Sequence, residues 1–263
     1  MSKLSILAKM TVHCSPWWVP FADRLGWLTQ GRKYEVTYRG TRWNLRAGVG
    51  DFAVLNEMFL HGTYDGALRG LRPGAVVIDI GSNIGAFSVA AAKAGAGVVW
   101  AFEPVPANLV LLRDNLARNQ LESVVKPAAN AVARQPGTLT LYTRDTDAGG
   151  GTLYPEIHRS WHASDGGGMA PDIRPIEVQC ITLNDFFRRE NIRHCDLLKL
   201  DCEGAEFEIL DSLDAETARA ISAVVFEYHS DGKLDAIIAL LRRLGFGRIE
   251  RHPTHQVILM TRD

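Results

Sequence analysis

From residue 75 onward, short apolar runs alternate with longer segments whose apolar residues recur at helical spacing. Four apolar runs are typical of strands buried on both faces: AVVIDI (75–80), GVVWAF (97–102), DLLKLD (196–201) and SAVVFEY (222–228). Two segments, IGAFSVAAAKAG (84–95) and PANLVLLRDNLARN (106–119), predict helices. This alternation predicts βαβ units and a doubly wound α/β sheet.

The end of the chain has a different pattern. FGRIER (246–251) and HQVILMT (255–261) are strand candidates on either side of a turn at residues 252–254. Two strands joined by so short a turn pair antiparallel. We therefore expect an antiparallel terminal strand, which distinguishes this sheet from an all-parallel dinucleotide-binding fold.

Residues 1–72 predict an N-terminal extension to a main domain at residues 73–263. KYEVTYRGTRWNLR (33–46) alternates about Gly40 and predicts a β-hairpin. SPWWVPFADRLGWL (15–28) is rich in aromatic residues and predicts a helical segment broken by prolines. A lid or a dimer surface is one interpretation, but we expect these tryptophans to pack onto the core.

Residues 144–175 carry two GGG runs and little periodicity. A loop of this length inside a compact domain is usually functional or disordered. We expect an insertion in the main domain that covers a substrate. His158 and His162 lie in it, and we expect both to be solvated rather than ligands.

Composition restricts the classes of binding partner and the cellular compartment that we expect for this protein. The 29 lysines and arginines nearly balance 30 acids, so net charge does not favour nucleic acid or anionic lipid as a partner. The spacing of the cysteines fits neither zinc nor a CxxC motif, which indicates reduced thiols: Cys14, Cys180, Cys195 and Cys202. Neither a signal peptide nor an apolar stretch of about 18 residues is apparent. We expect a cytoplasmic protein without a membrane span.

The loop DIGSNIG (79–85) follows the first predicted strand and opens the first predicted helix. Gly81 and Gly85 allow a ligand to approach the main chain, and Asn83 tolerates a left-handed conformation. The spacing is not the GxGxxG of a nicotinamide-binding unit. Glu103 ends the second strand, 22 positions after Gly81, where an acid can accept hydrogen bonds from both ribose hydroxyls. A helix-capping role before Pro104 is the alternative, but the combination favours an adenosine ligand.

Several segments carry a family resemblance, in this order: VVIDIGSNIGAFSVAAA, AFEPVPANLVLLRDNLARN, ITLNDFF, DLLKLDCEGAEFEIL and VVFEYH. From about Asp51 to Phe246 the chain resembles the FkbM family of S-adenosylmethionine-dependent methyltransferases. The KxDxEGxE block (199–206) is the most specific part, and Glu57 and Tyr64 match a family segment before the first strand. The resemblance implies a class I methyltransferase (Rossmann-like) fold with an antiparallel terminal strand, and O-methylation of a sugar or natural product.

The sequence and the resemblance together predict a binding site for S-adenosylmethionine. Its residues are Tyr64, Asp79, Gly81, Ser82, Asn83, Gly85, Glu103, Pro104, Asn108, Asn130 and Asp201. Asn184 stands where the family commonly has aspartate, and the 144–175 insertion is individual to this chain. These departures leave the acceptor undetermined.

Charged residues gather at the ends of the last two parallel strands, where ligands of open α/β sheets bind. Lys199 shares a strand face with Asp201, so it can serve as the counter-charge of a partly buried acid. Glu227 likewise shares a face with His229. We expect His229 to be the general base, oriented by Glu227, with Asp201 holding the acceptor or the methionine amino group. A structural role for His229 is the alternative.

A further interpretation makes these strand ends a site for Mg²⁺ or Mn²⁺, with ligands among Asp201, Glu203, Glu227 and His229. No ligand spacing demands a metal, so we do not expect one. Glu206 and Glu208 fall at the start of the next helix, whose dipole favours carboxylates, and are expected to be structural.

Three functions compete. The first is an S-adenosylmethionine-dependent O-methyltransferase acting on a small-molecule hydroxyl. The second is a protein that binds the cofactor without catalysis and serves as a partner. A nicotinamide-dependent oxidoreductase is third, and the glycine spacing disfavours it. The sequence leaves open whether the chain forms a homo-oligomer.

Overall fold

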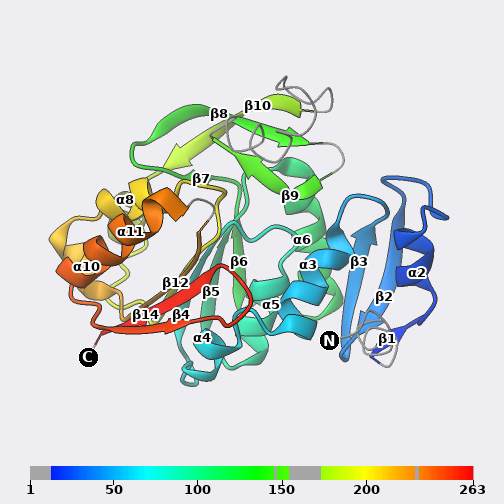
Figure 1. Cartoon of the computed structure of the whole chain (residues 1–263), viewed down its shortest axis with the longest axis horizontal. Helices are drawn as coiled ribbons and strands as arrows, with labels where there is room; N and C mark the ends of the chain where they lie inside the picture. Colours follow the sequence, from blue (N-terminus) through cyan, green and yellow to red (C-terminus); the bar gives the residue numbers. More distant parts are fainter. Residues whose placement is uncertain (1–12, 145–146, 154–172, 229–230, 263) are drawn as a thin grey trace.

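A computed structural model describes residues 13–144, 147–153, 173–228 and 231–262 (Figure 1). Its central sheet has seven strands in the order β13-β14-β12-β11-β4-β5-β6. The parallel strands are β4 (Val76–Ile80), β5 (Val98–Phe102), β6 (Val125–Ala128), β11 (Leu197–Leu200) and β12 (Ala223–Glu227). The strand order runs outward from β4 in one direction and from β11 in the other. The sheet therefore reverses between β4 and β11, as a doubly wound fold requires.

The antiparallel ending is confirmed. β14 (Val257–Thr261) lies between β12 and β13 (Arg248–Arg251) and runs antiparallel to both. This insertion of one reversed strand in an otherwise parallel sheet, with strand order as above, is the class I methyltransferase topology.

Helices cover both faces of the central sheet. Val77 and Val99 belong to a core cluster shared with α5 (Ala86–Lys93) and α6 (Pro106–Arg118). Ile78 and Phe102, the neighbouring strand positions on the opposite face, belong to a second cluster. That cluster includes residues of α8 (Leu183–Arg189), α9 (Glu206–Asp211), α10 (Ala215–Ala220) and α11 (Asp231–Arg243). The strands are apolar at successive positions because both of their faces are covered.

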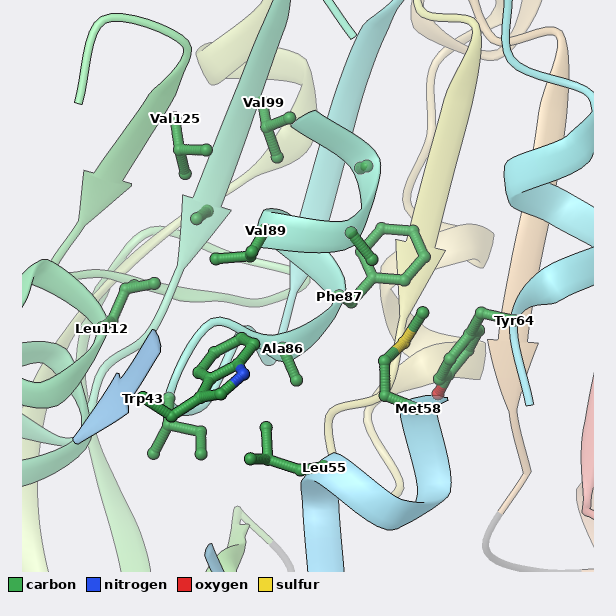
Figure 2. Packing of buried hydrophobic residues seen from close by; sticks show 14 of the residues in the cluster. Trp43, Leu55, Met58, Tyr64, Ala86, Phe87, Val89, Val99, Leu112 and Val125 are labelled. Carbon is green, nitrogen blue, oxygen red and sulfur yellow. The ribbon is translucent and has the colours of Figure 1, made fainter. Parts of the chain in front are cut away.

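The N-terminal extension shares the first core cluster. The predicted hairpin is confirmed as β2 (Lys33–Tyr38) and β3 (Thr41–Arg46), with β1 (Cys14–Ser15) beside β2. Figure 2 shows Trp43 of this hairpin among Leu55, Ala86 and Leu112. The extension is thus packed against α5 and α6 rather than separated from them.

Our expectation for the tryptophans of residues 15–28 is wrong. Trp17, Trp18 and Trp27 flank α2 (Val19–Arg24) and are exposed. The buried side of α2 consists of smaller residues instead, including Val19 and Ala22.

The segment before β4 contains a π-helical turn between two short α-helices. α3 (Asp51–Asn56) continues into the π-helical turn η1 (Glu57–His61), which ends at Gly62 with φ of 66°. α4 (Asp65–Arg69) follows. Single π-helical turns of this kind are frequent at functional sites.

A second sheet, of order β7-β10-β8-β9, lies over the carboxyl ends of the main strands (Figure 1). Its strands are β7 (Ala131–Val132), β8 (Gly137–Arg144), β9 (Asp147–Thr152) and β10 (Ile173–Ile181). Part of the predicted 144–175 loop is therefore strand, which corrects our interpretation. The glycines of β9 have no side chain, so the sequence there lacks the alternation of apolar and polar residues that predicts a strand. Residues 154–172, including His158 and His162, lie outside the described residues.

Within the described ranges, no helix is both long and apolar enough to cross a membrane.

Candidate active site

The loop after β4 closely approaches the neighbouring strand end. Gly81 has φ of 76°, and a Cβ there would lie 1.8 Å from the carbonyl oxygen of Asp201. Gly85 has φ of 92°, and its Cβ would lie 2.5 Å from Cδ1 of Leu112. Asn83 adopts a left-handed conformation, with φ of 49°. Both glycines are thus required by geometry, because a side chain would displace either backbone or core.

Glu103 anchors this loop. Its Oε2 accepts a hydrogen bond from the backbone N–H of Asn83 at 2.8 Å, and its Oε1 accepts one from Val105 at 2.8 Å. Only 4% of Glu103 is exposed. Burial raises the pKa of its carboxyl to about 7, against the opposing effect of these hydrogen bonds. The carboxylate has lone pairs left for hydroxyl donors, because each oxygen can accept two hydrogen bonds.

Glu103 is also linked to the N-terminal extension. Nδ2 of Asn108 is 3.5 Å from Oε1 of Glu103, and Oδ1 of Asn108 accepts a hydrogen bond from Arg46 at 2.8 Å. Arg46 in turn forms an ion pair with the buried Asp51 at 2.8 Å. Hairpin and cofactor loop are therefore parts of one polar network.

Two buried polar atoms in the pocket lack a partner among the described residues: Oγ of Ser82 and Oδ1 of Asn83. An unsatisfied buried polar atom costs about 1–3 kcal/mol. A ligand with polar groups would remove this cost. The loop therefore fits the methionyl part of S-adenosylmethionine, and Glu103 fits its ribose.

Lys199 is buried at the junction of β4 and β11. Its Nζ lies 3.1 Å from Oδ1 of Asp79 and 3.4 Å from Oδ2 of Asp201, which confirms the predicted Asp201 pair. It also donates to the carbonyl oxygen of Gly81 at 2.8 Å. Burial disfavours the charged amine, but Asp79 and Asp201 outweigh it and hold the pKa of Lys199 above its ordinary value. Lys199 is therefore a cation that fixes both the loop and the acid.

Tyr64 contacts the same carboxylate oxygen of Asp201 as Lys199 does. Its hydroxyl donates to Oδ2 of Asp201 at 3.2 Å. Burial, followed by the charges of Asp201 and Glu227, raises the pKa of Tyr64 well above its ordinary value. The phenol stays protonated and orients the carboxylate.

One pocket brings together most of the predicted site. Its lining includes Tyr64, Gly81, Ser82, Asn83, Glu103, Pro104, Asn108, Asn130, Lys199, Asp201 and Glu227. Asp79 and Gly85 are absent from this lining: Asp79 pairs with Lys199 and accepts a hydrogen bond from Ser88 at 2.6 Å. Both residues support the wall rather than form it. His229 lies outside the described residues.

The pocket also has walls that sequence reasoning missed. Val54 and Met58 come from α3 and η1, and Leu141 and Leu153 come from the second sheet region. Glu57, noted only for its family match, lines the pocket too. The helical spacing of Val54 and Met58 was visible, but not that their face meets the strand ends.

The helix-start acids have the structural roles we expected. Oε1 of Glu206 accepts hydrogen bonds from the backbone N–H of Cys202 at 3.0 Å and Gly204 at 3.3 Å. Glu208 pairs with Lys233 at 2.9 Å. In the part of the chain that the structure describes, no three His, Cys, Asp or Glu side chains are grouped so that they could hold a metal ion.

Comparisons with known proteins identify the family. Residues 79–247 match the family described as "Methyltransferase FkbM domain". "31-O-demethyl-FK506 methyltransferase FkbM" of Streptomyces tacrolimicus is 31% identical over 220 residues, which cover 77% of this chain and 84% of that protein. "Methyltransferase sdnD" of Sordaria araneosa is 31% identical over 211 residues, covering 73% and 81%. "Methyltransferase 1" of Beauveria bassiana is 28% identical over 208 residues, covering 76% and 82%.

Strand order and cofactor loop define a class I S-adenosylmethionine-dependent methyltransferase. Within that class, the chain belongs to the FkbM methyltransferase family. The membership supports methyl transfer over the nicotinamide chemistry considered above.

Proposed function

We propose that the protein methylates a hydroxyl group of a small natural product or sugar. The observation that carries this proposal is the placement of Asp201: Lys199 and Tyr64 hold it in the same pocket as the cofactor loop. A fixed carboxylate there can accept a hydrogen bond from an acceptor hydroxyl. The name of the Streptomyces relative, which describes a 31-O-demethyl substrate, supports oxygen as the acceptor atom.

The residues present fit the cofactor in three places. Glu103 would accept hydrogen bonds from the ribose hydroxyls, and residues 81–85 would hold the methionyl part. Asp201 would hold the amino group or the acceptor. When bound, S-adenosylmethionine supplies a methyl group activated by its sulfonium.

The protein's chemical task is to position the acceptor and remove its proton. Displacement needs the oxygen aligned with the methyl group, so positioning of the acceptor in the pocket supplies much of the rate. We propose His229 as the general base because it follows Glu227, which lines the pocket at the end of β12. Glu227 would orient it and stabilise its protonated form.

Acceptor screening tests the proposal directly. The protein would be incubated with methyl-labelled S-adenosylmethionine and matched acceptors that differ only in a hydroxyl, an amine or a hydrogen at one position. We expect labelled methyl ether and S-adenosylhomocysteine from the hydroxyl compound alone. Transfer to the amine instead would overturn the choice of oxygen. Tight cofactor binding without any turnover would favour the non-catalytic binding protein.

Glu103→Ala should weaken S-adenosylhomocysteine binding by about 1.5–3 kcal/mol for each charge-assisted hydrogen bond lost. Isothermal titration calorimetry measures this loss. Because Glu103 also holds Asn83 and Val105, circular dichroism must first show that the variant is folded. Glu122→Ala is the matched control, since Glu122 is an exposed glutamate outside the pocket lining, and it should leave the affinity unchanged. Unchanged affinity in the Glu103 variant would remove Glu103 from the site.

Cofactor affinity should fall as pH falls through about 7, because Glu103 has its pKa near 7 in the free protein. Only the carboxylate accepts two ribose hydroxyls, so binding releases a proton below this pH and affinity drops by up to about tenfold per pH unit.

The raised pKa of Glu103 also affects stability. Because folding binds a proton at this carboxyl, its contribution to the free energy of unfolding grows as pH falls from about 7 toward 4.5. Isothermal titration calorimetry of cofactor binding in buffers of different ionisation enthalpy measures the number of protons released on binding. Glu103→Gln should abolish the dependence; if it persists there, another group causes it.

Removal of divalent cations should leave turnover unchanged. The pocket supplies its own cation, Lys199, between Asp79 and Asp201. Initial rates with and without EDTA check this. Loss of activity that Mg²⁺ or Mn²⁺ restores would establish the metal interpretation of the strand ends instead.

A further inference from the structure

The outer side of the N-terminal extension carries an exposed aromatic surface, formed by Trp17, Trp18, Leu25 and Trp27. Their side chains are 62%, 50%, 59% and 75% exposed, respectively. They flank α2, which lies at the edge of the molecule farthest from the central sheet (Figure 1). None of the four lines the cofactor pocket. Four of the seven large apolar side chains that are exposed among the described residues therefore fall within residues 17–27, and such concentrations of exposed apolar side chains are typical of interaction sites.

The charge of this region differs sharply from that of the rest of the chain. Residues 1–72, the N-terminal extension, contain ten of the 29 basic residues but only five of the 30 acids, a net charge of +5. The remaining residues therefore carry −6. Arg24, Arg32 and Lys33 are exposed and close in sequence to the aromatic surface. The net charge of the whole chain is near zero because these two regions have opposite charges. It therefore does not argue against an anionic partner at the N-terminal extension.

A binding partner for the aromatic surface must accommodate the tryptophan rings and complement the positive charge beside them. A second copy in a two-fold dimer would place this positive surface against itself. A folded protein would need a pocket for each protruding indole. A bilayer needs no such pocket, because its headgroup region accepts tryptophan rings at any position and anionic lipids attract nearby arginine and lysine.

We propose that the aromatic surface binds the protein peripherally to an anionic lipid membrane. The indoles and Leu25 enter the headgroup region, and Arg24, Arg32 and Lys33 lie beside lipid phosphates. This proposal is independent of the acceptor and of the catalytic roles assigned above.

The test is binding of the full chain to vesicles of phosphatidylcholine alone or mixed with phosphatidylglycerol. We expect co-sedimentation and a blue shift of tryptophan fluorescence only with the mixed vesicles, both weakened by salt. Arg24→Ser, Arg32→Ser and Lys33→Ser together should weaken partitioning on the order of 100-fold, from about 1 kcal/mol for each charge. Serine at Trp17, Trp18 and Trp27 together should weaken it by at least about tenfold.

Val110→Ser combined with Leu139→Ser is the matched control, because both side chains are exposed apolar residues outside this surface. Vesicle binding should be unchanged in this control, and S-adenosylhomocysteine affinity should be unchanged in all variants. Equal binding to both vesicle types, or full binding by the tryptophan variant, would overturn the proposal. So would self-association that the tryptophan variant loses, with no vesicle binding, since a second copy would then be the occupant.

Discussion

Replacing His229 by alanine should lower turnover by about 10²–10⁴-fold, the usual contribution of a general base. The reason is chemical: an alcohol is a poor nucleophile until its proton is taken. Affinity for S-adenosylhomocysteine should remain nearly intact, because the proposed cofactor contacts lie in the loop after β4 and at Glu103. Rates with the true acceptor and calorimetry with the product cofactor separate the two effects.

His194→Ala is the matched control. This histidine is exposed on the surface near the start of β11, next to Asp196, and its loss should not change turnover. Asp201→Asn should impair both turnover and cofactor affinity, since its carboxylate would serve acceptor and cofactor. A His229→Ala enzyme that turns over at the wild-type rate would leave the reaction without our base and would point to Asp201 or Glu227.

Lys199→Met should reduce the free energy of unfolding by about 3–5 kcal/mol, the range for removing one partner of a buried ion pair. The methionine fills most of the volume but leaves Asp79 and Asp201 without the cation that they share. Asp79 is fully buried, so water cannot replace the lost charge. Chemical denaturation of the variant and the wild type measures the difference.

Lys233→Met provides the comparison at an exposed pair. Lys233 lies 2.9 Å from Glu208 and is 44% exposed, so its loss should cost at most about 1 kcal/mol. Adding Asp79→Asn to Lys199→Met should recover part of the lost stability, because one uncompensated charge disappears. A Lys199→Met protein as stable as the Lys233→Met protein would show that Asp79 and Asp201 do not depend on this cation.

The sequence alone predicted most strands and helices of the main sheet and the residues proposed for the cofactor half of the pocket. Continuous apolar runs specify strands covered on both faces, and helical spacing specifies what lies between them, so the main sheet could be anticipated. The loop at 79–85 and Glu103 follow from local chemistry: a turn that needs glycine, and an acid at a strand end. The pairing of Lys199 with Asp201 followed from strand alternation alone.

Only the tertiary structure decided which distant surfaces meet. Lys199 contacts Asp79 because β4 and β11 are neighbours, and strand order is set by packing of the whole domain rather than by either segment. Met58 reaches the pocket through a π-helical turn that no local pattern announced. Trp43 occupies the core and Trp27 stays in water, although both are tryptophans of the same extension. Composition and periodicity describe each segment's preferences, whereas burial depends on which side chains fill the volume between packed elements, and that is a property of the whole folded chain.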